Sequence, residues 1–257
     1  MTLEHDLADL RVAAPPHLLD GALARAGLVD AYVVRPSPLG DLYVVFGPDG
    51  IRAVDLAEGP GAFEAAYSER TGRDVVPAPG PPVALGRLDR ALTRGRPGDL
   101  PVDLTDLTDF QRAVLDVTAG IPAGEVRPYG WVAAEVGSPG ATRAVGSALA
   151  RNPVPVLVPC HRVVRSDGRI GNYSLGGPDN KRALLDAEGV DREAYETLAD
   201  RGVRYVGSDT TGIACLPTCH AARRITDAHR VEFRSAAAAT AAGYRACRHC
   251  RPKLAAA

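Results

Sequence analysis

The sequence predicts an α/β protein built in three parts, and three observations support this fold class. Residues 1–104 contain strand-like segments followed by helix-like segments, which favours a layered α/β domain. Residues 105–200 are expected to form a mainly helical domain, and residues 201–257 a small α+β module that holds four of the five cysteines. A chain of 257 residues can bury a sizeable core and form one to three domains.

Composition and charge narrow the class of protein. The chain is 46% hydrophobic and 24% charged, without an apolar run of membrane-spanning length or a signal-peptide pattern, so we expect a cytoplasmic protein with no membrane partner. Five cysteines do not suggest a secreted disulfide framework, and nothing indicates oligomerisation, so we expect a monomer. Residues 202–257 carry 9 basic and 3 acidic side chains, although the whole chain has a net charge of −1. This asymmetry favours a nucleic-acid partner, although a solvated basic tail would give the same pattern.

The first part of the chain shows recognisable strand and helix signals. A weak amphipathic leucine pattern in residues 1–30 predicts short helices. Further along, runs of β-branched and aromatic residues between Gly, Pro and Asp turns predict strands, and two helical segments follow them on either side of a proline-rich loop. The expected strands are 31–34, 42–46 and 51–56, and the expected helices are 62–71 and 83–94.

The middle part begins with a helix-start signal. Thr108-Asp-Phe-Gln111 is a capping-box pattern, in which each of the two end residues can bond the backbone of the other. Two short helices are expected over residues 131–136 and 141–151, joined by a Gly-Ser-Pro-Gly turn. This outline is typical of a helix-turn-helix, although many helical hairpins bind nothing.

A proline-punctuated apolar run, Asn152-Pro-Val-Pro-Val-Leu-Val-Pro, leads into Cys160 and His161. Its prolines remove backbone donors and fix φ, so we expect neither a helix interior nor a free central strand. A rigid, buried segment that ends in a thiol beside an imidazole is a plausible way to build a reactive cysteine, because the thiolate is the nucleophile.

The C-terminal part carries a cysteine pattern typical of a metal site. A CxxxC pair is followed by a CxxC pair in a small basic module, and the four residues are Cys215, Cys219, Cys247 and Cys250. This spacing is a strong signal for a four-cysteine structural zinc site, which would supply much of the module's folding energy. Reduced, unliganded thiols are the alternative. His220, His229 and His249 could substitute as ligands, but four cysteines already complete a tetrahedron.

The phrase NPVP followed by PCHRV resembles the active-site signature of the O6-alkylguanine-DNA alkyltransferases. These single-use repair proteins move an alkyl group from damaged guanine in double-stranded DNA to their own cysteine. The resemblance implies that Cys160 is the acceptor, that no diffusible organic cofactor is needed, and that the partner is double-stranded DNA carrying O6-alkylguanine. The SPLG-D-L phrase at residues 37–42 implies an RNase-H-like scaffold for the first part.

The same resemblance assigns roles at the base pocket. It implies that Tyr129 rotates the target nucleotide and that Arg143, in the R-A-V-G phrase of the second short helix, fills the gap left by the extruded base. It assigns Pro155 and Tyr173 to the pocket walls, and the backbone at Val163 and Ser174 to reading the base edge.

Around the thiol, the resemblance assigns His161 as the base, acting through a bridging water, and Glu188 of the Ala-Glu-Gly phrase as the group that orients it. Asn152 is expected to tie the recognition helix to the active-site turn. The chain departs from the family at Gly171-Asn-Tyr-Ser-Leu-Gly-Gly177, which is one residue longer than usual. This difference loosens the assignments of Tyr173, Ser174 and Glu188.

Residues 211–223 and 242–252 are similar to the zinc domain of Ada-type proteins, although Ada carries this domain ahead of its other parts. In that domain the first of the four cysteines binds zinc and also accepts methyl groups from phosphotriesters of the DNA backbone. The matching residue is Cys215.

Three other functions are considered. A protein that binds alkylguanine without repairing it would lack the acceptor, and this chain retains Cys160. A methylation-sensing regulator would need a further sequence-reading domain, which the sequence does not indicate. A Cys-His hydrolase would need an oxyanion hole, and nothing obvious supplies one.

Overall fold

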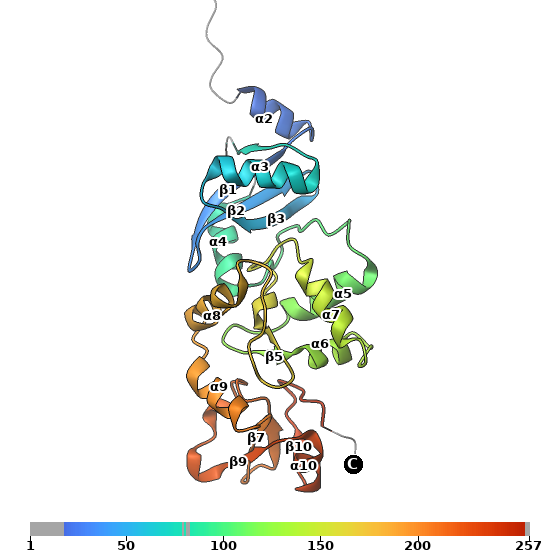
Figure 1. Ribbon diagram of the computed structural model, residues 1–257, viewed down its shortest axis with the longest axis vertical. Coiled ribbons are helices and arrows are strands. Elements are labelled where there is room, and N and C mark those ends of the chain that lie inside the picture. Colours follow the sequence, from blue (N-terminus) through green and yellow to red (C-terminus); the bar gives the residue numbers. More distant parts are fainter. Residues whose placement is uncertain (1–17, 79, 81–82, 255–257) are drawn as a thin grey trace, which may run out of the picture.

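The computed structural model describes residues 18–78, 80 and 83–254. It is elongated, with the N-terminal sheet at one end, a helical part in the middle and the cysteine-bearing module at the other end (Figure 1). Within the described residues, no helix has the length and apolar character required to cross a membrane.

The N-terminal part is a four-stranded sheet in the order β3-β2-β1-β4, in which the first three strands are antiparallel and β4 runs parallel to β1. Its elements are α2 (Leu18–Arg25), β1 (Asp30–Ser37), β2 (Gly40–Gly47), β3 (Gly50–Leu56), α3 (Pro60–Thr71), β4 (Val75–Pro77) and α4 (Leu85–Arg94). The three expected strands and two expected helices are confirmed. Strand β4 was not expected, because it lies at the edge of the proline-rich loop. The leucine pattern before residue 18 lies outside the described residues.

Both faces of this sheet are buried, and β2 shows why. Side chains alternate along a strand, so Leu42, Val44 and Phe46 enter the main core while Tyr43 and Val45 face α3. The rings of Tyr43 and Phe63 of α3 stack with centroids 4.4 Å apart. The sheet is therefore held between α3 on one face and the rest of the molecule on the other.

The middle part is mainly helical. It contains α5 (Asp109–Ala119), β5 (Arg127–Pro128), α6 (Tyr129–Glu135), α7 (Thr142–Ala150), the 3₁₀ turn η1 (Cys160–Arg162), β6 (Val163–Val164), α8 (Gly177–Ala187) and α9 (Arg192–Asp200). The capping box is confirmed, because Thr108 Oγ1 accepts a bond from the Gln111 amide and the Gln111 side chain accepts one from the Thr108 amide. The two short helices also lie where they were expected.

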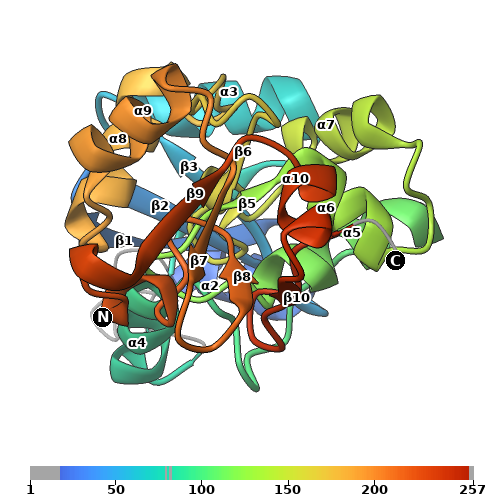
Figure 2. The same cartoon turned by 90° about the horizontal axis from the view of Figure 1, so that it is seen from below.

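The C-terminal module is a four-stranded sheet in the order β10-β8-β7-β9 with one helix beside it. Its elements are β7 (Tyr205–Ser208), β8 (Ile213–Cys215), the 3₁₀ turns η2 (Ala222–Arg224) and η3 (Asp227–His229), β9 (Arg230–Phe233), α10 (Ala236–Ala241) and β10 (Arg245–Ala246). Seen from below, strands β9, β7 and β8 of this module lie in front of the other two parts (Figure 2). The chain after β10 contacts the middle part, because Trp131 Nε1 of α6 donates a hydrogen bond to the Cys250 carbonyl.

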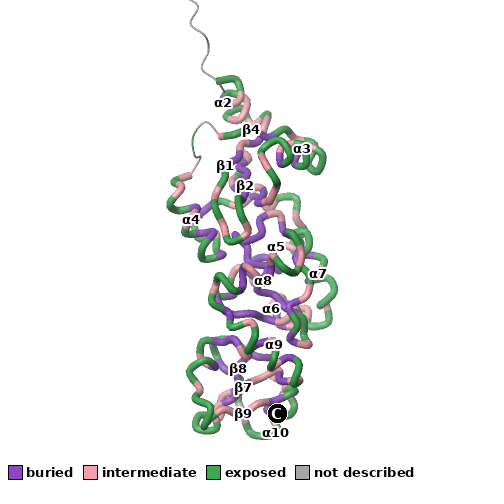
Figure 3. The backbone as a smooth tube through the Cα atoms, turned by 60° about the vertical axis from the view of Figure 1, so that its left-hand side comes forward, coloured by how far each residue is buried: buried purple, intermediate pink, exposed green. Residues whose placement is uncertain are grey.

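One buried core connects the three parts. A single cluster of buried residues extends from Leu42 of β2 through Trp131 of α6 to Cys250. Buried backbone accordingly runs through the centre of the molecule along its length (Figure 3). The segments that hold the candidate site are therefore packed on both sides.

Candidate active site and metal centre

The loop before Cys160 is held together by the side chain of Asn152. Its Oδ1 accepts a hydrogen bond from the Val154 amide at 3.1 Å, and its Nδ2 donates to the Val158 carbonyl at 2.9 Å. The same Nδ2 lies 3.2 Å from Cys160 Sγ and donates to it. Asn152 comes two residues after Ala150, the last residue of α7, so this one side chain connects the end of the helix to the loop and the thiol.

The loop also stores backbone strain. Val156 has a φ of 69°, a left-handed conformation that a β-branched residue rarely adopts. Such a conformation costs about 1–3 kcal/mol and persists only where the surroundings impose it. Here Val156 is 5% exposed, and the Val158 amide bonds the Val154 carbonyl at 2.8 Å across it. The turn that presents Cys160 is therefore rigid.

Cys160 is buried, with 5% of its surface exposed, at the first position of η1. Burial raises the pKa of the thiol, while the Asn152 hydrogen bond and the charge of Lys181 oppose that rise. Lys181 is itself fully buried on α8 and donates to the Val163 carbonyl at 2.6 Å and the Asn172 carbonyl at 3.4 Å. Burial lowers the pKa of Lys181 to about 8, against the attraction of Cys160. The site thus provides a cation and an amide donor for a thiolate.

His161 contacts Glu188, the group expected to orient it. His161 Nε2 lies 2.8 Å from Glu188 Oε1, and the His161 ring is buried. Burial lowers the pKa of His161 despite the hydrogen bond with Glu188. A neutral ring that donates from Nε2 keeps a lone pair on Nδ1, and this Nδ1 is buried without a hydrogen-bond partner among the described residues. Nδ1 is therefore the atom able to receive a proton.

Glu188 is fixed in turn by Arg162, which is 1% exposed. The guanidinium donates to both Glu188 oxygens, with Nε 2.9 Å from Oε2 and Nη2 2.6 Å from Oε1, and also to the carbonyls of Ile121 and Arg94. Burial raises the pKa of Glu188, but the bonds from His161 and Arg162 outweigh it and lower the pKa to about 2. A Cβ at Gly95 would lie 2.5 Å from Arg162 Nη2, so this approach requires glycine.

The residues assigned to the base pocket lie around this centre. Tyr173 is buried, its hydroxyl has no hydrogen-bond partner among the described residues, and its ring lies edge-on to His161 at 6.1 Å. Burial raises the pKa of Tyr173 well above 10, so its phenol remains a neutral donor. Tyr129 begins α6 with its ring 6.0 Å from Lys181 Nζ.

The other residues assigned to the base pocket and the DNA contact have no direct bond to the Cys160 thiol among the described residues. Pro155 and Ser174 line a pocket of about 660 Å³ together with Asn152, at the junction with β3. Val163 is buried, and its carbonyl already accepts a bond from Lys181, although a carbonyl can accept a second one. Arg143 is exposed on α7.

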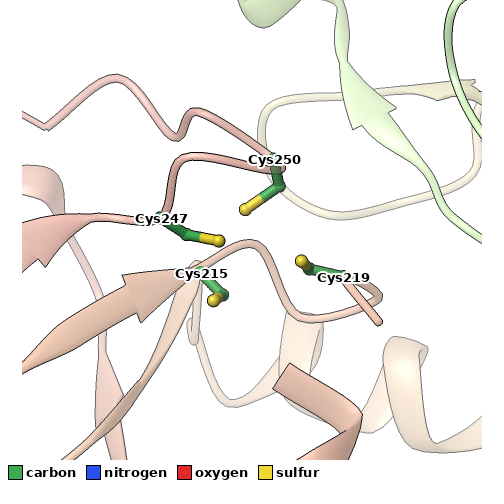
Figure 4. A group of neighbouring side chains, drawn as sticks. All are labelled: Cys215, Cys219, Cys247 and Cys250. Carbon is green, nitrogen blue, oxygen red and sulfur yellow. The ribbon is translucent and has the colours of Figure 1, made fainter. Parts of the chain in front are cut away.

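The four cysteines form one cluster. The sulfur atoms of Cys215, Cys219, Cys247 and Cys250 all lie within 4.8 Å of one another, and all four residues are buried (Figure 4). A tetrahedral zinc with Zn–S bonds of about 2.3 Å needs sulfurs at such separations. The Leu216 amide also donates to Cys250 Sγ at 3.3 Å, a bond that suits a thiolate acceptor. The donor set therefore fits zinc.

The three histidines of the module have other partners. His249 Nε2 lies 3.0 Å and His220 Nδ1 3.8 Å from Glu125 Oε1, and His229 Nδ1 lies 2.9 Å from Asp209. Glu125, His220 and His249 do lie next to Cys219, close enough to form a second group of potential ligands. The four-cysteine set is the better candidate, because all four of its residues are buried. In the other set, Glu125 already accepts bonds from Arg127 and the His220 amide.

Sequence reasoning missed two groups at the centre. Lys181 carried a usable signal, because it is one of only two lysines in the chain and lies on a helix beside the active-site stretch. Arg162 was part of the PCHRV phrase but received no role. Its contacts come from segments near residues 94 and 121, which no local pattern connects to it.

Comparisons with known proteins agree with this geometry. Residues 109–190 match the family described as 6-O-methylguanine DNA methyltransferase, DNA binding domain, and residues 196–253 match the metal binding domain of Ada. A methylated-DNA--protein-cysteine methyltransferase of Methanothermobacter thermautotrophicus is 40% identical over 162 residues, which cover 61% of this chain and 84% of the relative.

Two further proteins are similar to this chain. A protein of the same name from Mycobacterium tuberculosis is 46% identical over 102 residues, which are 40% of this chain and 61% of that relative. The crystal structure of Mycobacterium tuberculosis OGT in complex with DNA is 34% identical with a TM-score of 0.50 and covers 64% of this chain and 98% of that one. Together with the preceding match over most of a relative's length, these similarities show that the chain belongs to the methylated-DNA--protein-cysteine methyltransferase family.

Proposed function

We propose that this protein repairs O6-alkylguanine in double-stranded DNA by direct reversal, with Cys160 as the alkyl acceptor. The observation that carries the proposal is the position of the Cys160 thiol, which is bonded by Asn152 and follows a rigid loop beside the His161–Glu188 pair. Retention of this thiol also argues against a protein that only binds the lesion. The proposal requires no diffusible organic cofactor.

The reaction is a single displacement. The Cys160 sulfur attacks the alkyl carbon, a C–S bond forms, and the C–O bond to guanine O6 breaks. The bonding electrons remain with guanine, which takes up a proton and is restored. The thioether left on Cys160 has no easy hydrolysis route, so each protein molecule reacts once.

Removal of the thiol proton is assigned to His161. Because its Nε2 is engaged by Glu188, Nδ1 is the acceptor, and one bridging water provides the route from Cys160. Glu188 holds the tautomer and stabilises the ring when it becomes charged. Lys181 would stabilise the thiolate, since it is a buried cation whose pKa responds to Cys160.

The DNA contacts are assigned to the middle part. We propose that α6 and α7 form a helix-turn-helix, that Tyr129 rotates the target nucleotide, and that the exposed Arg143 fills the space it leaves. Pro155 and Tyr173 would form walls of the base pocket, while Val163 and Ser174 would read the base edge through their backbone.

We further propose that Cys215, Cys219, Cys247 and Cys250 hold a structural zinc ion, which keeps their sulfurs deprotonated. Cys215 is also proposed as acceptor for methyl groups from phosphotriesters. In that step the Cys215 sulfur takes the methyl carbon and a phosphodiester anion leaves. Cys215 is 2% exposed, so this second transfer requires local opening of the module.

The remaining expectations concern architecture and location. We propose domain boundaries at residues 1–104, 105–200 and 201–257, with an RNase-H-like scaffold in the first. The strand order β3-β2-β1-β4 with a parallel β4 supports that assignment. A monomeric, cytoplasmic protein remains the expectation.

The proposal is tested by repair stoichiometry. Duplex DNA with one O6-methylguanine is incubated with increasing protein, and restored guanine is measured by chromatography of the digested DNA. The expected result is one guanine restored per protein molecule, with no further turnover. Continued turnover, or DNA binding without restored guanine, would overturn the proposal.

A further inference from the structure

The segment from Gly124 to Glu135 is fastened to the cysteine module by a buried carboxylate. Glu125 is 2% exposed, and its Oε1 accepts a bond from the His220 amide at 3.0 Å and lies 3.0 Å from His249 Nε2. Its Oε2 accepts a bond from Arg127 at 2.5 Å. His220 and His249 are sequence neighbours of Cys219 and Cys250. A buried charge with this many partners fixes the position of both sides.

Contacts on both sides of Glu125 extend this interface. The Val126 amide donates to Thr218 Oγ1 at 2.9 Å, between two of the cysteines in sequence. Trp131 Nε1 donates to the Cys250 carbonyl at 2.9 Å. At the end of α6, Glu135 pairs with Arg251 at 2.7 Å and with Lys253 at 2.9 Å. The loops that carry the four sulfurs are therefore the loops that contact this segment.

The same segment also contacts the candidate active site. The Gly124 amide lies 3.4 Å from Glu188 Oε2, next to the His161 contact. Strand β5 pairs with β6, with Arg127 opposite Val163, and β6 follows η1 directly. Tyr129, assigned to nucleotide rotation, comes immediately after β5. Within six residues the chain thus touches the module, the His161–Glu188 pair and the nucleotide-rotating side chain.

We propose that the zinc-bound module positions the 124–135 segment for extrusion of the target nucleotide, with Glu125 as the positioning residue. This inference rests on the proposed repair function and deepens it. A module of this size holds its loops in place chiefly through its metal. The state of the four-cysteine site would then affect alkyl transfer at Cys160 without any zinc chemistry at that thiol.

The test compares Glu125→Gln with Asp209→Asn in the full-length protein. Glu125→Gln keeps the size of the side chain but removes the charge. Asp209→Asn removes a carboxylate that pairs with His229 inside the module, at 2.9 Å, and is the matched control. Zinc content and hydrogen exchange of the amides of residues 124–135 are measured first. Single-turnover rates are then measured with O6-methylguanine duplex DNA and with the free base O6-benzylguanine, which needs no extrusion.

For Glu125→Gln the expected result is faster exchange in residues 124–135 by about tenfold, as for loss of a hydrogen bond to a charged group. The duplex rate should fall by about tenfold while the free-base rate stays within about twofold of the parent, since only nucleotide extrusion is affected. Zinc content should be unchanged, and Asp209→Asn should behave as the parent. Thr218→Val, which removes the bond to Val126, is the second variant and should shift the same two readouts in the same direction.

Two outcomes would overturn the inference. In the first outcome, Glu125→Gln and Thr218→Val both react with duplex DNA at the same rate as Asp209→Asn and show the same hydrogen exchange. The other is an equal loss with duplex and free base, because that would mean a general structural defect. If the parent protein reacts with neither the duplex nor the free base, the proposed repair function itself is refuted. The two failures are therefore distinguishable.

Discussion

Replacement of Glu188 by glutamine removes the charge that the centre is arranged around. Arg162 and His161 both bond this carboxylate, and Arg162 is fully buried. The lowering of its pKa from an ordinary 4.5 to about 2 corresponds to about 3 kcal/mol at neutral pH. Leaving a buried guanidinium without its counter-charge costs about 3–5 kcal/mol, which agrees with that figure. We therefore expect Glu188→Gln to lower the free energy of unfolding by about 3 kcal/mol.

The pH dependence provides an independent check on this value. A carboxyl whose pKa is lower in the folded state stabilises fully above its unfolded pKa and loses that effect as the pH falls through the folded pKa. The difference between the parent and Glu188→Gln should therefore be about 3 kcal/mol at pH 7 and about 1.5 kcal/mol at pH 3.

Urea unfolding followed by fluorescence of Trp131 measures both differences, with Asp179→Asn as control for an exposed carboxylate that pairs with Arg182. Single-turnover kinetics should show alkyl transfer slowed by about 100-fold, since the base loses its orienting group. A difference below about 1 kcal/mol at pH 7, or one that does not change between pH 7 and pH 3, would refute the reasoning.

Three other outcomes are expected. Cys160→Ser should bind duplex DNA that carries O6-methylguanine, free of phosphotriesters, as the parent does in fluorescence anisotropy, but it should accept no methyl group by mass spectrometry; a methylated Cys160→Ser protein would place the acceptor elsewhere. The single-turnover rate should begin to fall only at a pH below that at which an ordinary imidazole is protonated, because burial lowers the pKa of His161 and Nδ1 stops accepting only when the ring is protonated. A rate already falling between pH 8 and 7 would contradict a neutral His161. Arg143→Ala should slow the reaction with duplex DNA by about tenfold or more but leave the rate with the free base unchanged. Only the duplex has a gap, left by the extruded nucleotide, that Arg143 must fill. Equal losses on both substrates would remove Arg143 from the DNA interface.

Local signals in the sequence predicted much of the fold. The capping box at Thr108 placed the start of α5, and β-branched runs between turns placed the first three strands, because both effects depend on neighbours within a few residues. Cysteine spacing likewise predicted the cluster, since each CxxxC or CxxC pair is already close in the chain. Strand β4 escaped detection because it is three residues long and ends in proline.

Long-range contacts were less accessible from sequence. The assignment of Glu188 was loosened by the extra residue in the 171–177 stretch, yet the structure brings it to His161. The chain turns at Gly176 and Gly177, with φ values of 77° and 82°, immediately before the body of α8, and buries Leu175. Glu125 could not be placed, because its partners come from segments that no periodic pattern connects to it. For Lys181 the only signal was the rarity of lysine in the chain, which does not identify its partners.

The most direct test of alkyl transfer to Cys160 is peptide mapping by mass spectrometry after incubation with duplex DNA that carries O6-methylguanine and methylphosphotriesters. One methyl group is expected on the peptide that contains Cys160, formed in proportion to the guanine restored. A second methyl group on Cys215 would make this a two-acceptor protein. Binding of the DNA with no methyl group on Cys160 would show that Cys160 is not the alkyl acceptor.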